Sequence, residues 1–213
     1  MAIALELDYD ALPALLTRVT GDEKHDKSAL STLDVLWVLF DRVLGEEDVF
    51  LLSKGHGPAA FYAVLAAKGL LPLERLDGFG TFDSPLGYHP DRILVPAAGI
   101  GSGSLGHGLP IAVGRSLTGR HVYVLVGDGE LDEGSSWEAV QYAGRVGLDT
   151  LTVAVVDNLS STHGWPGGAE RRFELEGWTA LRVDGRDHDA LEEAFRSRSA
   201  GRPHAVVAKV EPR

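Results

Sequence analysis

The sequence contains no cysteine and few basic residues, and both absences narrow what the protein can do. Without cysteine the chain can form neither a disulfide nor a thiolate metal site, and it has no sulfur nucleophile. Lysine and arginine total 20 against 31 aspartate and glutamate residues, which gives a net charge of −11. A chain this acidic is not expected to bind nucleic acid through a basic face, so any phosphate that it holds should be bridged by a metal ion.

Long hydrophobic runs are also missing. No segment approaches the ~18 uninterrupted apolar residues that indicate a membrane-spanning helix. The N-terminus carries Glu6, Asp8 and Asp10, whereas a secretory signal would have a basic stretch and an apolar run there. Because the chain also lacks thiols, a reducing compartment suits it. We therefore expect a cytoplasmic protein that makes no membrane contact.

Short apolar runs alternate with amphipathic segments, as in an α/β protein. Hydrophobic residues make up 44% of the chain, and its 26 glycines suit βα turns that need positive φ. The patterns predict strands over 48–53, 121–126, 150–156, 179–183 and 204–210, and helices over 28–44, 59–67, 106–117, 135–146, 169–177 and 189–198. Residues 70–96 contain many breakers and should be loop with short helices. We expect one domain over residues 1–213, with a doubly wound, mostly parallel sheet and helices on both faces.

Polar residues follow two of the predicted strands at their carboxyl ends. Asp128 lies in the run Gly127-Asp128-Gly129, and Asn158 follows the next strand thirty positions later. Ligands of open parallel sheets bind beyond these strand ends, and Mg²⁺ prefers oxygen ligands such as carboxylates and amides. Gly129 has no side chain to keep its N–H from a phosphate oxygen, and the next helix adds a positive dipole end. The pattern predicts a magnesium diphosphate site, although glycine, aspartate and asparagine are also common in turns and caps.

Further motifs occur in a fixed order along the chain. They are His25, Ser53-Lys54-Gly55-His56-Gly57, Gly87-Tyr88-His89-Pro90, Gly101-Ser102-Gly103-Ser104-Leu105-Gly106, Gly127-Asp128-Gly129-Glu130-Leu131 with Glu133-Gly134, and Asn158. Together they resemble the N-terminal, diphosphate-binding domain of transketolases. The resemblance implies a thiamine diphosphate-binding fold that holds the cofactor with Mg²⁺ or Ca²⁺.

The resemblance also implies a role for individual residues. Asp128, Asn158 and the carbonyl of Ser160 would bind the metal ion. The cofactor would contact His56, Gly103, Ser104, Leu105, Gly127, Asp128, Gly129, Glu130 and Asn158. The catalytic set would be His25, His56 and His89 near the substrate, with Glu133 at a subunit interface that couples active sites. Two of these histidines have simpler explanations, because His25 lies in a charged run that solvent could surround and His89 lies in a proline loop that could be structural.

The run Gly101-x-Gly103-x-x-Gly106 also matches a dinucleotide-binding fingerprint. That fingerprint requires a strand before it and an acidic residue about 20 positions later. The short segment 93–95 followed by Pro96 makes a poor strand, and position 126 is valine. Nicotinamide binding is therefore not expected.

Thiamine catalysis needs a buried glutamate against the pyrimidine ring of the cofactor. In the family that the chain resembles, this glutamate belongs to a pyrimidine-binding domain, which we expect to be absent from residues 1–213 together with the C-terminal domain. We therefore expect the N-terminal subunit of a two-component enzyme, active only with a partner subunit that supplies the glutamate and forming a heterotetramer. Its reaction would transfer a two-carbon ketol unit between ketose and aldose substrates.

Three alternatives stay open at this point. The α-subunit of a 2-oxoacid dehydrogenase shares the aspartate and asparagine pair but would not be expected to show the motifs at 53–57 and 87–90. A 1-deoxyxylulose 5-phosphate synthase shares more of the histidines but is normally one longer chain. A non-catalytic scaffold could keep the same fold, although the retained Asp128 and Asn158 argue against it.

Overall fold

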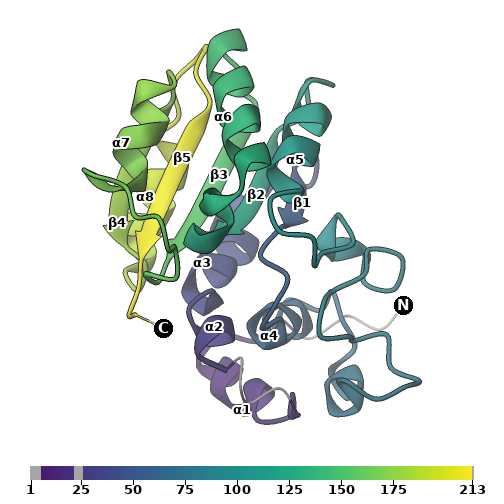
Figure 1. Ribbon diagram of the computed structural model, residues 1–213. Coiled ribbons are helices and arrows are strands. Elements are labelled where there is room, and N and C mark those ends of the chain that lie inside the picture. Colours follow the sequence, from purple (N-terminus) through teal and green to yellow (C-terminus); the bar gives the residue numbers. More distant parts are fainter. Residues whose placement is uncertain (1–5, 22–25, 213) are drawn as a thin grey trace.

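A five-stranded parallel sheet forms the centre of the protein, as described by a computed structural model of residues 6–21 and 26–212 (Figure 1). In spatial order the strands are β1 (Val49–Leu52), β2 (Val122–Gly127), β3 (Leu151–Asp157), β5 (His204–Lys209) and β4 (Thr179–Asp184). Every pair of neighbours is parallel. The predicted parallel α/β architecture is confirmed, and the strands that precede Asp128 and Asn158 are direct neighbours.

Helices cover both faces of the sheet because alternate strand residues point to opposite sides. In β2, Val122 and Val124 belong to one core cluster, while Tyr123 and Leu125 belong to the other. The first cluster is closed by α5 (Gly108–Ser116), α6 (Gly134–Val146) and α7 (Gly168–Leu175). The second is closed by α3 (Leu33–Val38), α4 (Ala59–Ala67) and α8 (His188–Arg196).

Several short elements surround this three-layer core. They are η1 (Tyr9–Ala11), α1 (Leu12–Leu16), α2 (Asp26–Leu30), η4 (Leu73–Gly78), η5 (Pro96–Ala98) and η6 (Asp128–Asp132). Between η4 and η5 the chain is irregular, as the breakers of residues 70–96 predict. Within the described ranges, no helix combines the length and apolar character needed to cross a membrane.

The expectation of one continuous helix over residues 28–44 is wrong. The structure divides this segment into α2, α3 and the π-helical turn η3 (Leu39–Val43). At the first break, the Ser31 hydroxyl donates to the carbonyl of Ser28 and the Thr32 hydroxyl to that of Ala29, both at 2.7 Å. Hydroxyl groups that bond locally to the backbone compete with the helical ladder. The apolar periodicity continues through this break, so periodicity alone did not reveal it.

The end of α6 approaches the backbone after α7 very closely. A β-carbon placed on Gly144 would lie 1.8 Å from the carbonyl oxygen of Glu176. Nearby, the fully buried Trp178 donates from Nε1 to the carbonyl of Val140 at 2.8 Å. Glycine at position 144 is therefore a packing requirement, because backbone on the opposite side cannot move aside like a flexible side chain.

We expect Gly144→Ala to lower the free energy of unfolding by about 1–3 kcal/mol, because the added methyl group overpacks this contact. The matched control is Gly114→Ala in α5, where a β-carbon meets nothing within 4 Å. That change should be neutral or stabilising by up to about 1 kcal/mol through helix propensity. Urea denaturation measures both variants, and equal effects of the two would contradict the proposed close approach.

Candidate functional site

The predicted motifs come together at the carboxyl ends of β1, β2 and β3. A β-carbon on Gly55 would lie 2.1 Å from Ser102 Oγ, so the turn after β1 touches the segment before α5. A β-carbon on Gly108 would likewise lie 2.0 Å from Ser53 Oγ. Both glycines allow backbone segments to approach where any side chain would collide. The structure therefore gathers motifs that are far apart in sequence into one loop cluster.

The carboxyl group of Glu130 ties three parts of this cluster together. It accepts hydrogen bonds from Ser53 Oγ, from the N–H of Gly106 at 3.2 Å and from the N–H of Gly127 at 3.3 Å. Its side chain is buried, with 3% of the residue exposed. Burial raises the pKa of Glu130 against the opposing effect of these hydrogen bonds and of the nearby Lys54 charge. In this structure Glu130 contacts the loops that form the site.

Lys54 is a buried cation beside the same turn, and sequence reasoning assigned no role to it. Its Nζ donates to the carbonyl of Ser28 at 2.9 Å and to the Ser28 hydroxyl at 2.8 Å. Its stem passes Gly127, where a β-carbon would lie 3.2 Å from Lys54 Cδ. Lys54 therefore connects the end of β1 to α2 and restricts position 127 to a small residue.

Asp128 binds the loop that follows β3. Its carboxylate accepts from the N–H of Ser160 at 2.6 Å, from Ser160 Oγ at 2.5 Å and from the N–H of Ser161 at 3.0 Å. Asp128 is 5% exposed. A carboxylate has about four acceptor positions, so these three bonds leave room for a further electropositive partner.

Asp132, one turn of η6 later, holds the next part of this loop. It accepts from Ser161 Oγ at 2.6 Å and from the N–H and hydroxyl of Thr162 at 2.7 and 2.9 Å, and His163 Nδ1 lies 3.4 Å away. Partial burial acts to raise the pKa of Asp132, but the bonds from Ser161 and Thr162 and the nearby His163 hold it below its usual range. Sequence reasoning missed Asp132, although its spacing of four from Asp128 was a usable signal.

Asn158 has an acceptor that nothing in the described chain satisfies. It is 1% exposed, and its Nδ2 donates weakly to Ser31 Oγ at 3.5 Å. Its Oδ1 is buried with no hydrogen-bond partner among the described residues. A buried unpaired acceptor is unfavourable unless an ion, water or ligand supplies the missing contact. Leu159, which follows, adopts φ of 57°, and this left-handed residue turns the chain back towards Asp128.

The donors at this point suit a hard divalent cation. Asp128 supplies carboxylate oxygens, Asn158 an unpaired amide oxygen, and Ser160 a carbonyl oxygen close to Gly129, whose β-carbon would lie 3.7 Å from it. Mg²⁺ and Ca²⁺ both prefer oxygen ligands of these kinds. Among residues 6–21 and 26–212, no group of three or more histidine, aspartate or glutamate residues forms an alternative metal site. The predicted ligand set therefore fits such an ion chemically.

The remaining predicted residues lie around this centre at different depths. His56 is partly buried in the turn after β1, and His89 is exposed with its ring against Gly103, whose β-carbon would lie 3.3 Å from His89 Cδ2. Ser104 and Leu105 are exposed beside them. Glu133 is exposed at the start of α6, next to Gly106. His25 lies outside the described residues.

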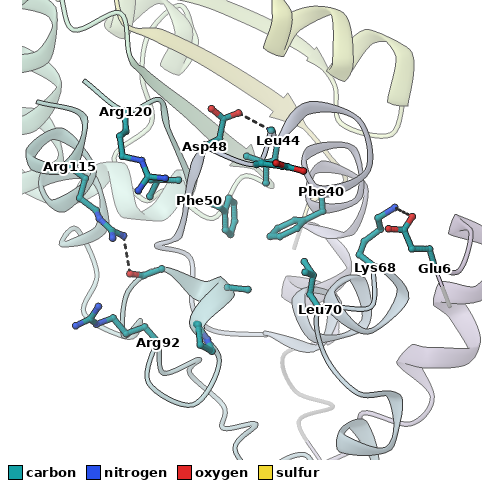
Figure 2. A pocket seen from close by; sticks show the side chains of 16 residues that line it. Glu6, Phe40, Leu44, Asp48, Phe50, Lys68, Leu70, Arg92, Arg115 and Arg120 are labelled. Carbon is teal, nitrogen blue, oxygen red and sulfur yellow. Dashed lines mark hydrogen bonds and ion pairs between the residues drawn. The ribbon is translucent and has the colours of Figure 1, made fainter. Parts of the chain in front are cut away.

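A cavity of about 860 Å³ lies away from this cluster, at the amino end of β1 (Figure 2). Figure 2 shows three arginines and two aromatic rings around it: Arg92, Arg115, Arg120, Phe40 and Phe50. None of the predicted site residues that the structure describes lines this cavity. The oxygen-rich loop cluster is therefore the candidate site.

Comparisons of sequence with known proteins bear on this site. Residues 22–121 and 113–210 match the family described as transketolase, thiamine diphosphate binding domain. The protein named Ferredoxin fas2 from Rhodococcoides fascians is 49% identical, over 96% of this chain and 73% of that protein. An apulose-4-phosphate transketolase subunit from Actinobacillus succinogenes is 33% identical, over 86% of this chain and 75% of that protein. Because this chain has no cysteine, it cannot itself ligate an iron–sulfur cluster through thiolates.

A third relative and a solved structure extend the comparison. A 6-deoxy-6-sulfo-D-fructose transketolase subunit from a Clostridium species is 32% identical, over 86% of this chain and 75% of that protein. The structure of transketolase from Leishmania mexicana superposes with a TM-score of 0.78 at 23% identity, which shows a shared fold. The match covers 96% of this chain but 37% of that one, so the chain spans little more than a third of that transketolase.

The raised pKa of Glu130 predicts a pH-dependent stability. Between the ordinary glutamate pKa and the raised value, the folded chain keeps a proton that the unfolded chain has released. The stabilisation that Glu130 adds to the free energy of unfolding is therefore fully present below the ordinary pKa. It is lost as the pH rises from the ordinary pKa through the raised pKa. Glutamine resembles the protonated form of glutamate. We therefore expect Glu130→Gln to remove this decrease of the free energy of unfolding with rising pH.

Urea denaturation at a series of pH values measures this effect as the free energy of unfolding. Glu138→Gln is the matched control, because Glu138 is exposed on α6 and its replacement should leave the slope as in the parent chain. An unaltered slope in Glu130→Gln would show that Glu130 does not titrate abnormally in the fold.

Proposed function

The chain belongs to the transketolase family, in which it corresponds to the thiamine diphosphate binding domain, and on this basis we propose that it holds the metal–diphosphate end of that cofactor. The observation that carries the proposal is the buried, unpaired Oδ1 of Asn158, a residue that follows β3, the strand next to the one that ends at the Asp128 turn. A bound cation would give this acceptor the partner that it lacks within the described chain. The parallel strand ends that carry both residues are the usual binding edge of such a sheet.

Asp128, Asn158 and the Ser160 carbonyl are the proposed ligands of Mg²⁺ or Ca²⁺. The N–H of Gly129 is proposed to bind a diphosphate oxygen, since no side chain there blocks the approach. Gly127 and Glu130 support the same turn from behind through the hydrogen bond between them. The chain is strongly acidic, so a divalent cation is the natural means of holding a diphosphate here.

Thiamine diphosphate supplies, when bound, a carbon that attacks a ketose carbonyl and an electron sink for the cleavage that follows. For the residues of this chain we propose binding and positioning roles. Gly103, Ser104 and Leu105 would line the cofactor rings, and His89 lies next to this segment, since a β-carbon on Gly103 would be 3.3 Å from His89 Cδ2. His56, His89 and His25 are proposed to contact the substrate hydroxyls. Glu133 is proposed to lie at a subunit interface.

A partner subunit is proposed to supply the glutamate that activates the cofactor. Support comes from two relatives that are named as transketolase subunits and of which this chain covers 75%. Their names refer to apulose-4-phosphate and 6-deoxy-6-sulfo-D-fructose, which are sugars with an anionic group. We propose a two-carbon ketol transfer between sugars or sugar-like substrates, carried out in the cytoplasm by a heterotetramer.

Asp128→Asn should weaken Mg²⁺-dependent binding of thiamine diphosphate at least ~10-fold, because even residues that only support metal ligands have effects of this size. Calorimetric titration of the assembled complex measures the affinity. The matched control is Asp149→Asn at the amino end of β3, where the Asp149 carboxylate accepts the Gly201 N–H at 2.8 Å. Equal affinity in the parent and Asp128→Asn complexes would refute the metal assignment.

Ketol transfer should require both polypeptides. We expect no activity from the purified chain with Mg²⁺, thiamine diphosphate, a ketose donor and an aldose acceptor, and activity when a pyrimidine-domain polypeptide is added. Full activity of the chain alone would refute the two-component proposal. Lipoamide-dependent acyl transfer or pyruvate decarboxylation by the complex would instead support a 2-oxoacid dehydrogenase or a deoxyxylulose-phosphate synthase. A complex that binds no cofactor would support a scaffold.

A further inference from the structure

Arg172 on α7 lies in a corner formed by two tryptophan rings. Its guanidinium carbon is 3.4 Å from the ring centroid of Trp137 and 3.7 Å from that of Trp165. The two rings are 5.3 Å apart and inclined at 66°, so the guanidinium contacts both faces at once. Arginine is well suited to such a position because its flat, weakly hydrated cation stacks on aromatic rings.

Two donor atoms of this corner lack hydrogen-bond partners in the described part of the chain. Nη1 of Arg172 and Nε1 of Trp165 are both buried without a hydrogen-bond partner among the described residues. Burial lowers the pKa of Arg172, opposed by the charge of Glu176. Buried donors that lack partners are unfavourable, and native proteins tolerate them chiefly where function requires an arrangement. An apolar side chain at position 172 would avoid burying an unpaired donor, so the stacked guanidinium is the feature of this corner that calls for an explanation.

Trp137, on α6, is hydrogen-bonded to the turn that carries Asp128, and Trp165 lies in the loop that follows Asn158. Trp137 Nε1 donates to the carbonyl of Leu131 at 2.5 Å, and Leu131 lies in η6 with Asp128. Trp165 lies at the far end of the loop that begins after Asn158, and its carbonyl accepts the N–H of Gly168 at 2.8 Å, at the start of α7. Arg172 therefore touches, through one ring each, the turn after β2 and the loop after β3.

The near end of the same loop is bound to the η6 carboxylates. Ser160 and Ser161 donate to Asp128, and Thr162 donates to Asp132. A loop held at only one end would still move at the other. With Trp165 fixed in the arginine corner, residues 160–165 are held at both ends.

We propose that Arg172 and Trp165 are positioning residues that keep the loop of residues 160–165 closed on η6 and so fix the Ser160 carbonyl for metal binding. The role of the Ser160 carbonyl in metal binding rests on the proposed function, whereas the closure of the loop on η6 concerns the chain alone. Neither residue belongs to the set that the family resemblance assigns. This role requires a planar cation between two aromatic rings. A side chain of similar size without the planar charge should therefore not replace Arg172.

The first test measures amide hydrogen exchange of the free, full-length chain. In Arg172→Met, which keeps length and apolar bulk, the amides of Ser160, Ser161 and Thr162 should exchange about 10-fold faster, because the loop loses the cation–π contact at its far end. Arg172→Lys keeps the charge but cannot stack as a plane, so intermediate exchange is expected. The control is Arg171→Met, since Arg171 is exposed and paired with Glu174 on the same helix. Unchanged exchange in Arg172→Met overturns the proposal.

The second test measures Mg²⁺-dependent binding of thiamine diphosphate to the complex by calorimetry. Arg172→Met should weaken it about 10-fold, the size typical of residues that orient metal ligands, and Arg172→Lys should restore part of the loss. Faster exchange combined with unchanged affinity would overturn the link to the metal. If the parent complex binds no metal or cofactor, the proposed function fails, while the exchange result still decides whether Arg172 holds the loop.

Discussion

The site is built around one buried carboxyl group, that of Glu130. Ser53 at the end of β1, Gly106 before α5 and Gly127 at the end of β2 all donate to its two oxygens. Parallel strands align their carboxyl ends, but nothing in a sheet determines how the following loops meet. The carboxyl group of Glu130 fixes how these loops meet, because any donor that moved away from it would leave a buried polar group unpaired. The relative positions of the glycine-rich segments therefore depend on Glu130.

The charged and polar side chains around Glu130 differ in how completely their hydrogen bonds are satisfied. The carboxylates of Asp128 and Asp132 are stabilised by hydroxyl and backbone N–H donors from residues 160–162. Lys54, a buried cation at this edge, is bound to Ser28. Asp157, directly before Asn158, is paired with Arg182 at 2.7 Å, whereas the printed donors to the Asp128 carboxylate are the N–H and hydroxyl of Ser160 and the N–H of Ser161. In a protein of net charge −11, this electrostatic setting favours a divalent ion.

Much of the fold was accessible from the sequence, and the limits have physical causes. Strands such as 121–126 and 150–156 are continuous apolar runs, and sheets covered on both faces require this. The single helix predicted over residues 28–44 failed because hydroxyl groups at Ser31 and Thr32 bond to the local backbone without altering hydrophobic periodicity. The rule that parallel strands end at one edge of the sheet predicted that Asp128 and Asn158 follow neighbouring strands, and the pairing of β2 with β3 agrees. It did not reveal Asp132 or the Arg172 corner, because these depend on how a loop folds back on a turn, for which sequence has no simple period.

The residues of the candidate site differ in how far their side chains are exposed to solvent. Asn158 and Asp128 are 1% and 5% exposed, whereas Leu105 in the segment 103–105 is 43% exposed and His89 is also exposed. A buried anchor beside an exposed segment suits a ligand that is held at one end by this chain and left accessible at the other. The exposed Leu105 side chain provides apolar area that a second surface could cover. This burial pattern agrees with the two-component enzyme proposed above, in which this chain would bind the charged end of the cofactor and a second polypeptide would activate it.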